Sequence, residues 1–355
     1  MKAWEDKIRK VVPYVAGEQP NKPDMVKLNT NECPYPPAPG VKRVLDDLDT
    51  SKFRLYPDPE AKLLIKELAK FYNVDEDMVF VGVGSDDVLA NAFLTFFNSD
   101  KPILFPDITY SFYPVWAELY KIKYETPKLD KNFAMNKEDY YVPNGGIIFP
   151  NPNAPTSLLE DLDTIEDIIK HNQESVVIVD EAYIDFGGES ALSLVNKYEN
   201  LLVVQTFSKS RSMAGMRIGF AVGNRDLIKA LNDIKYSINS YTLNYPSIIA
   251  GAEAVKDREY FEKTCNKIIQ TRENTKKVLG DMGFEFPDSK SNFLFATHKN
   301  IDIIELFEFL RTKNVYVRHW NAPLIRDYVR ISIGTDSEME IFFKYVKEFM
   351  KEKTK

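Results

Sequence analysis

Short apolar runs alternate with longer amphipathic segments through the middle of the chain. Segments 85–97 and 157–171 carry apolar residues at helical spacing, and Ser85 is predicted to cap the first of them. Runs rich in Val, Ile and Phe are typical of buried strands, and they cover 78–84, 102–106, 146–150, 175–183 and 200–208. This alternation predicts an α/β fold with a mainly parallel sheet and helices on both faces.

The pattern changes after about residue 224. Residues 250–283 are strongly charged and predict one long amphipathic helix between two lobes. A smaller α+β lobe should follow, with strands at 292–297, 315–320 and 328–334 and helices at about 301–312 and 336–352. We therefore expect an N-terminal arm at 1–30 packed on the small domain, a large domain at 31–245, and a linking helix with the small domain at 246–355.

The composition narrows the classes of function. Of 355 residues, 44% are hydrophobic and 28% are charged, as in ordinary soluble globular proteins. A net charge of −7 argues against a nucleic-acid-binding surface, which would need a basic face. The two cysteines, Cys33 and Cys265, imply no disulfide framework, and we find neither a secretory signal nor a membrane span. A cytoplasmic protein is expected.

Polar residues follow four of the predicted strands, and ligands of open α/β sheets bind at such strand ends. In GVGSDD, Ser85 and Asp86 open a helix whose free N–H groups could bind phosphate, although a plain glycine turn would look the same. Asp180 follows an apolar run, with Glu181 and Tyr183 beside it, so its carboxylate should be buried. A buried carboxylate at Asp180 would need a cationic or protonated partner. The alternative is that it only accepts hydrogen bonds from the amides of a loop.

The stretch TFSKSRSMAGMRIGF gathers hydroxyls and cations at the end of another strand. Thr206, Ser208 and Arg217 could hold a phosphate, and Lys209 could form an imine, although a solvated basic loop is the simpler alternative. Tyr110, after a fourth strand, could stack on a planar ligand or belong to the core. Together, a phosphate cup, a carboxylate for a pyridine nitrogen, a phenol and a lysine predict pyridoxal 5′-phosphate.

The order of the motifs resembles the histidinol-phosphate aminotransferase family of fold-type I pyridoxal-phosphate enzymes. The resemblance runs from about Tyr14 to Thr335, and its most specific parts are DEAYIDF and FSKSRSMAGMRIGF. It is supported by LNTNECPYPP, YPDP, GVGSDD, PDITY, NPNAPT and YVRISIGT. It implies transfer of an amino group between histidinol phosphate, a phosphorylated amino alcohol, and 2-oxoglutarate. The products would be imidazole acetol phosphate and glutamate.

The resemblance also implies residue roles. Lys209 would form the imine and later move a proton, Asp180 would hold the pyridine nitrogen protonated, and Tyr183 would donate to the phenolic oxygen. Tyr110 would stack on the cofactor ring. The cofactor phosphate would be bound by Ser85, Asp86, Thr206, Ser208 and Arg217. In a homodimer, Tyr56 of the neighbouring subunit would also reach this phosphate. The substrate would be bound by Tyr14, Arg318 and Arg330.

The sequence departs from the family pattern at two positions. Ala154 in NPNAPTS replaces an Asn that usually bonds the phenolic oxygen, which leaves Tyr183 as the donor unless Asn153 compensates. Cys33 stands where Asn is commoner. Neither departure touches Lys209 or Asp180, so the cofactor prediction is unaffected.

Other readings share part of the pattern. A threonine-phosphate decarboxylase or a broad aromatic aminotransferase of the same fold would carry nearly all these motifs. A regulatory ligand-binding protein with this fold would need an attached helix-turn-helix domain with a basic face, which we do not expect. A nicotinamide-dependent dehydrogenase would leave Lys209 and Arg330 unexplained.

Overall fold

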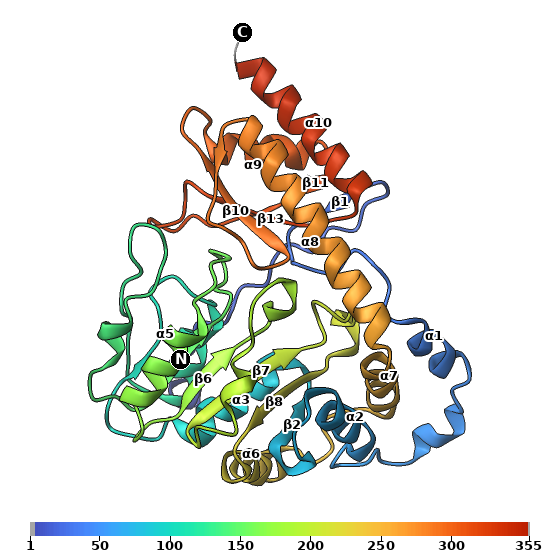
Figure 1. The fold of residues 1–355 in the computed structure, drawn as a ribbon, viewed down its shortest axis with the longest axis vertical. Helices are drawn as coiled ribbons and strands as arrows, with labels where there is room; N and C mark the ends of the chain where they lie inside the picture. The colour runs from blue at the N-terminus through green and yellow to red at the C-terminus, as the bar shows by residue number, and fades with distance from the viewer. Residues whose placement is uncertain (1–3, 354–355) are drawn as a thin grey trace.

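The computed structural model describes residues 4–353, so residues 1–3 of the predicted arm and residues 354–355 lie outside the described part. Figure 1 shows a large lobe built around one sheet and a smaller lobe above it, with helix α8 (Arg258–Asp281) running from one lobe to the other. The α/β class and the second, smaller lobe are therefore confirmed.

The large lobe contains a seven-stranded sheet within the described residues. Its strand order is β2 (Val79–Gly82), β8 (Gly219–Gly223), β7 (Leu201–Thr206), β6 (Val177–Asp180), β5 (Ile147–Pro150), β3 (Ile103–Leu104) and β4 (Tyr124–Glu125). All neighbouring strands are parallel except β8, which is antiparallel to β2 and β7. The five predicted strands are confirmed, whereas β4 and β8 had not been predicted.

Helices cover both faces of this sheet because successive strand residues are apolar on both sides. In β6, Val177 and Val179 belong to one buried cluster and Ile178 belongs to the cluster on the opposite face. The helices of this lobe are α1 (Pro39–Asp46), α2 (Lys62–Tyr72), α3 (Gly84–Phe96), α4 (Phe112–Tyr120), α5 (Leu162–His171), α6 (Arg225–Ile238) and α7 (Tyr245–Lys256). Short 3₁₀ helices occupy Glu5–Lys7, Thr50–Arg54, Glu76–Met78, Lys137–Tyr140, Ile184–Phe186, Ala191–Leu194 and Ala214–Met216.

Two predictions about helix ends are wrong. Ser85 does not cap α3, because the helix already begins at Gly84 and the side chain of Asp87 accepts the N–H of Val83 instead. The predicted helix at 250–283 is two helices, α7 and α8, separated at Asp257. The Asp257 backbone is not helical and its carboxylate accepts the N–H of Tyr260, which is an N-cap that starts a new helix.

Within the described residues, the small lobe packs three helices on a four-stranded antiparallel sheet. Its strand order is β12 (Arg318–His319), β13 (Val329–Ser332), β10 (Phe293–His298) and β9 (Phe284–Glu285), and its helices are α8, α9 (Ile303–Thr312) and α10 (Asp336–Lys353). The predicted strand at 315–320 is split, since β11 (Val315–Tyr316) leaves this sheet and pairs in parallel with β1 (Val26–Lys27). The N-terminal segment is thereby held against the small lobe, while the domain boundaries remain a prediction.

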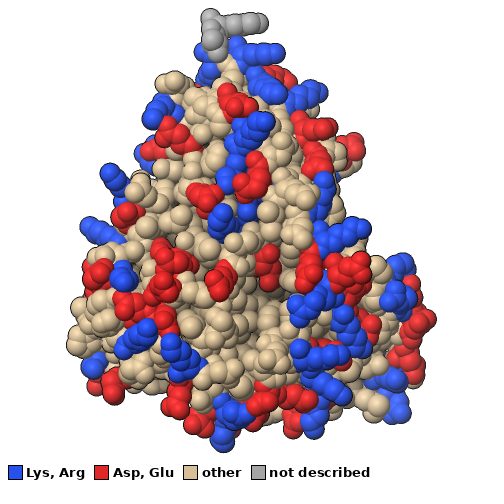
Figure 2. Space-filling view, in the orientation of Figure 1, with Lys and Arg blue, Asp and Glu red and all other residues tan. Residues whose placement is uncertain are grey.

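The surface carries both signs of charge. On the face seen in Figure 2, acidic and basic side chains are interspersed over both lobes. Among residues 4–353, none of the helices combines the length and the apolar character that crossing a membrane requires.

Candidate active site

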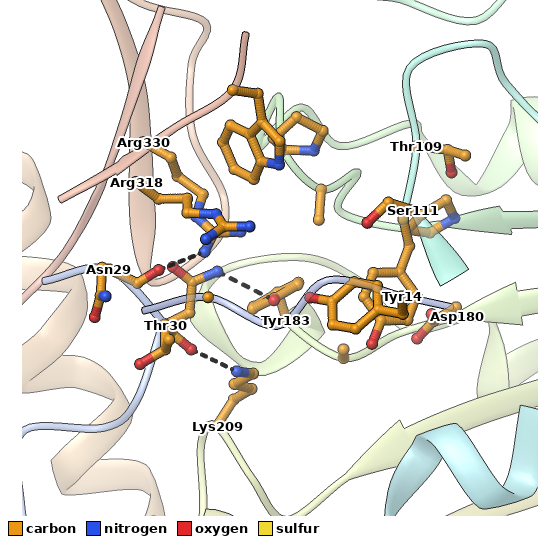
Figure 3. A pocket seen from close by; sticks show the side chains of 18 of the residues that line it. Tyr14, Asn29, Thr30, Thr109, Ser111, Asp180, Tyr183, Lys209, Arg318 and Arg330 are labelled. Atoms are coloured by element: carbon orange, nitrogen blue, oxygen red, sulfur yellow. Dashed lines mark hydrogen bonds between the residues drawn. The ribbon is translucent and has the colours of Figure 1, made fainter. Parts of the chain in front are cut away.

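A cavity of about 480 Å³ lies where the carboxyl ends of β5, β6 and β7 meet the small lobe and the N-terminal segment. Twelve of the thirteen predicted site residues line it, namely Tyr14, Ser85, Asp86, Tyr110, Asp180, Tyr183, Thr206, Ser208, Lys209, Arg217, Arg318 and Arg330. Residues from both ends of the chain therefore meet in one place, as Figure 3 shows for several of them.

Lys209 lies in the loop that connects β7 to the antiparallel strand β8. This hairpin connection is why the lysine stands at the carboxyl end of a central strand, facing the cavity. Its Nζ donates to the carbonyl oxygen of Thr30 at 3.0 Å, and lies 5.7 Å from the centroid of the Tyr183 ring (Figure 3). The amine is thus held by one backbone carbonyl and by the face of an aromatic ring.

Asp180 is the last residue of β6 and is only 4% exposed. Its Oδ2 accepts the hydroxyl of Tyr113 at 2.9 Å, whereas its buried Oδ1 has no hydrogen-bond partner among the described residues. Burial raises the pKa of this carboxyl to about 7, because the charged form is poorly solvated. A buried acceptor without a partner fits a ligand that brings a protonated nitrogen.

The candidate phosphate-binding residues cluster at the start of α3. Arg217 Nη2 lies 3.2 Å from Asp86 Oδ2, and Arg217 Nη1 donates to Ser208 Oγ at 3.5 Å. Gly84 adopts a φ of +82°, a backbone conformation that favours glycine, and a Cβ there would also come within 2.5 Å of Arg217 Nη2 and displace the end of that side chain. Thr206 Oγ1 donates to Ser208 Oγ at 3.0 Å. Hydroxyls, a guanidinium and helix N–H groups together suit a phosphate.

The Asp86 side chain serves this cluster indirectly. Its Oδ1 accepts the hydroxyl of Tyr110 at 2.9 Å while its Oδ2 pairs with Arg217. The carboxylate therefore orients a tyrosine and an arginine, and the backbone N–H groups of the first turn of α3 are the parts that suit an anion. Tyr14 joins the same wall, with its ring stacked on Phe112 at 4.2 Å.

Arg318 and Arg330 are directly opposite each other in β12 and β13. Arg330 Nη2 donates to the carbonyl oxygen of Asn29 at 2.8 Å, and both guanidinium groups lie over the Trp320 ring, at 5.3 and 5.0 Å from its centroid. Burial lowers the pKa of Arg330. Among residues 4–353 neither arginine forms an ion pair. Two unpaired cations on the cavity wall suit an anionic ligand.

Within the described residues, Asp327 does not form an ion pair with Arg318. The carboxylate of Asp327 instead lies 3.8 Å from the Nε of its neighbour, Arg326. The suggestion that Asn153 replaces the missing amide at Ala154 is also not supported, since the Asn153 amide donates to Ile108 O at 3.0 Å and to a loop hydroxyl at 2.9 Å. Ala154 itself lines the cavity.

Several residues of the site were missed by the sequence analysis. Asn31 Nδ2 donates to the Tyr183 hydroxyl at 3.1 Å, and Ser332 Oγ holds the Asn31 amide oxygen at 2.8 Å. Thr30 and Asn31 lie in the LNTNECPYPP motif, which offered a signal for them, whereas nothing in the sequence distinguished Tyr113 or Trp320. Their contacts join segments far apart in the chain.

Tyr56 is the predicted site residue that does not line the cavity. Its side chain is 81% exposed, and its ring stacks on that of Tyr241 at 4.6 Å. It lies between α1 and α2 in the chain, on the surface of the large lobe. Its role in a neighbouring subunit stays a prediction.

Comparison with known proteins agrees with this geometry. The family model "Aminotransferase class I and II" matches residues 23–346. A histidinol-phosphate aminotransferase of Brachyspira hyodysenteriae is 51% identical over 347 residues, which cover 98% of this chain and 98% of the relative. One of Lactococcus lactis subsp. cremoris is 49% identical over 353 residues, which cover 99% of this chain and 99% of the relative. A Sinorhizobium meliloti histidinol-phosphate aminotransferase, solved in complex with pyridoxal-5′-phosphate, shares the fold, with a TM-score of 0.82, 19% identity and 91% of each chain covered. The chain belongs to the class I and II aminotransferases.

Proposed function

We propose that this protein is a pyridoxal-phosphate-dependent aminotransferase that interconverts histidinol phosphate and 2-oxoglutarate with imidazole acetol phosphate and glutamate. The observation that carries the proposal is one cavity that holds the Lys209 amine, an oxygen of buried Asp180 and two arginines. Among residues 4–353, that oxygen has no hydrogen-bond partner and neither arginine has an ion-pair partner. Close relatives named histidinol-phosphate aminotransferase support the substrate.

The residues present fit the cofactor. Pyridoxal 5′-phosphate, when bound, supplies an aldehyde that condenses with amines and a protonated ring that withdraws electrons from the carbon bearing the amine. The open Oδ1 of Asp180 would hold the proton at the ring nitrogen. The hydroxyls of Thr206 and Ser208, with Arg217, would hold the phosphate.

Lys209 would move the proton that transamination requires. Its Nζ, once free of the cofactor, would take a proton from the substrate carbon that bears the amine and return it to the cofactor carbon that becomes the new amine carbon. The Thr30 carbonyl, 3.0 Å from Nζ, offers an acceptor that keeps the free amine pointed in one direction.

Tyr183 would donate to the phenolic oxygen of the cofactor. Because the Asn31 amide donates to the hydroxyl oxygen of Tyr183, the hydroxyl hydrogen of Tyr183 is left free to be donated to a ligand. This arrangement gives Tyr183 a defined donor role at a site where Ala154 supplies no amide.

Arg318 and Arg330 would bind the anionic end of each substrate. Glutamate brings a planar carboxylate and histidinol phosphate brings a tetrahedral dianion, so one arginine suits the first and two suit the second. Tyr14, on the opposite wall of the cavity, would add a hydroxyl.

We further propose a homodimer in the cytoplasm. Exposed apolar side chains lie close in the chain to Tyr56 or to Tyr241, on which its ring stacks. They are Phe53 at 53%, Leu55 at 54%, Ile238 at 63% and Tyr241 itself at 43% exposure, and exposed apolar surface of this kind suits a protein partner. A symmetric dimer through it would carry Tyr56 towards the partner's cavity. Free Cys33 and Cys265 fit a reducing compartment.

The test is an assay of the purified enzyme with pyridoxal 5′-phosphate and histidinol phosphate. We expect glutamate to form only when 2-oxoglutarate is present, with no release of carbon dioxide from threonine phosphate. Lys209→Ala should abolish turnover and still bind the cofactor through its phosphate. Decarboxylation without consumption of 2-oxoglutarate, or an active Lys209→Ala enzyme, would contradict the proposal.

A further inference from the structure

Tyr113 stands directly behind Asp180, on the side away from the ligand cavity. It lies in the first turn of α4 and does not line the cavity, and its hydroxyl donates to Asp180 Oδ2 at 2.9 Å. The other carboxylate oxygen, Oδ1, is buried and has no partner among residues 4–353. The two oxygens of one carboxylate therefore have different surroundings.

The Tyr113 ring cannot easily turn away from Asp180. The residue is fully buried, and its ring is surrounded by the rings of Phe93, Phe105, Tyr110 and Trp116, with centroids 6.1, 5.9, 5.7 and 6.4 Å away. Close packing of this kind restricts a side chain to one rotamer. The hydroxyl is thus a donor fixed in position by aromatic packing.

Few other groups favour the charged form of Asp180. Burial and the negative charge of Asp86 both raise the pKa of its carboxyl, while the Tyr113 hydroxyl and the backbone N–H of Ala182 lower it. The phenolic pKa of Tyr113 is itself raised by burial and by Asp180, so the tyrosine remains a proton donor. Tyr113 supplies the one side-chain hydrogen bond that Asp180 receives within the described residues.

We propose that Tyr113 is the positioning residue of the electron-withdrawing system: its hydroxyl fixes the Asp180 carboxylate and favours its ionised form, so that Oδ1 is the oxygen left to hold the proton on the cofactor's ring nitrogen. This inference rests on the proposed function and adds a residue that never touches the cofactor. It predicts that removing the buried Tyr113 hydroxyl makes the cofactor's ring nitrogen hold its proton less strongly.

The experiment removes the Tyr113 hydroxyl and measures the protonation of the cofactor's ring nitrogen. Tyr113→Phe holoenzyme is prepared with pyridoxal 5′-phosphate labelled with ¹⁵N in the ring, and the nitrogen shift is followed against pH. We expect a smaller protonated fraction than in the wild type and a kcat lower by about tenfold to a hundredfold, because a hydrogen bond to a charged group is lost. The KM for glutamate should change little, since the arginines are untouched.

Tyr140→Phe is the matched control. Tyr140 is a buried tyrosine of the same lobe whose hydroxyl has no hydrogen-bond partner among the described residues, so the same chemical change there should leave the nitrogen signal unaltered. Asp180→Asn provides the reference for a lost ring proton. Tyr113→Phe added to Asp180→Asn should have no further effect, because the tyrosine acts through the carboxylate.

The outcomes separate this inference from the proposed function. A wild type that binds no cofactor, or in which Asp180→Asn changes nothing, would overturn the function itself. A Tyr113→Phe enzyme with a wild-type nitrogen signal, or additive effects in the double variant, would overturn the inference alone. If Tyr113→Phe does not fold, a fluorotyrosine at position 113 keeps the shape and donates more strongly. The fluorotyrosine variant should raise the protonated fraction of the ring nitrogen, and a lower fraction would contradict the inference.

Discussion

Two neighbouring carboxyl groups at the end of β6 are buried alike and have different surroundings. Burial raises the pKa of both Asp180 and Glu181 to about 7. Glu181 is satisfied by the hydroxyl of Ser190, the amide of Gln205 and the backbone N–H of Ala191. Asp180 keeps one oxygen that has no hydrogen-bond partner in the part of the chain that the structure describes. Of these two carboxyl groups, Asp180 is the one suited to bind a ligand, because its hydrogen bonds within the protein are incomplete.

We predict that Asp180→Asn stabilises the ligand-free protein, and that the gain depends on pH. Between pH 4 and 7 the unfolded carboxyl is ionised and the folded one is protonated, so the folded state binds more protons and loses stability as pH rises. The variant should therefore gain up to about 4 kcal/mol in free energy of unfolding at pH 8 and little at pH 4. Urea unfolding at both values measures this, and an equal gain at both would contradict it.

The second residue-scale prediction separates the two arginines. Arg318→Ala should weaken binding of the phosphorylated substrate by roughly 2–4 kcal/mol through lost charge-assisted bonds and should affect glutamate much less. Arg330→Ala should damage both half-reactions. Single-turnover absorbance of each half-reaction measures both variants. Equal losses for the two substrates in Arg318→Ala would remove Arg318 from substrate discrimination.

Site residues with a distinctive local motif could be predicted from the sequence, and those defined by distant contacts could not. Lys209 and Asp180 stand at the ends of apolar runs, which marks them locally. Asn31 matters because it meets Tyr183, and Tyr113 because it meets Asp180, across 152 and 67 residues. Such pairings depend on the order of strands in the sheet, and that order cannot be predicted from a single sequence.

At the element scale, hydrophobic patterning located the buried strands and failed where a local feature interrupts an otherwise continuous pattern. The charged stretch at 250–283 keeps helical spacing throughout, so only the cap at Asp257 divides it. The run at 315–320 reads as one strand, although β11 and β12 join different sheets. The antiparallel strand β8, with the residues GFAVG, had not been predicted, since two of its five residues are glycines, which are uncommon in strands.

The loop after β5 gives a prediction about stability. Ser157 has a φ of +68°, where a Cβ is strained, and its buried hydroxyl has no partner among the described residues. Its backbone is held by hydrogen bonds with Asn153 and Lys290, so the conformation is imposed. Ser157→Gly should stabilise the protein by about 1 kcal/mol relative to Ser157→Ala, which keeps the Cβ. Thermal unfolding compares them, and a more stable alanine variant would contradict this.

At the scale of the whole molecule, the cavity depends on the relative placement of two lobes. Lys209 and Asp180 belong to the large lobe, while Arg318 and Arg330 come from the small lobe (Figure 3). The N-terminal segment contributes Asn31, which contacts both Tyr183 and Ser332. The distance between the cofactor end and the anion end of the site is therefore set by packing between lobes.

We predict that two inactive variants restore activity when their subunits are mixed. If Tyr56 serves the partner's site, a mixed dimer of Lys209→Ala and Tyr56→Ala subunits contains one intact site and one with both changes. Random reassociation should recover about a quarter of wild-type activity, because half of the dimers are mixed. Steady-state assays after reassociation measure the recovery. The absence of recovery, with a dimer seen by ultracentrifugation, would place Tyr56 outside the partner's site.

The pairing of β1 with β11 also bears on how the chain matures during synthesis. Val26 is aligned with Val315, so the partner of the first strand leaves the ribosome about 290 residues later. At usual translation speeds this delay is roughly 15–60 s, during which the N-terminal segment must wait without its partner. Thr30, whose carbonyl oxygen accepts from Lys209, lies three residues after the end of this strand. A nascent chain stalled before residue 315 should therefore leave its N-terminal segment open to protease, and release of the complete chain should close it.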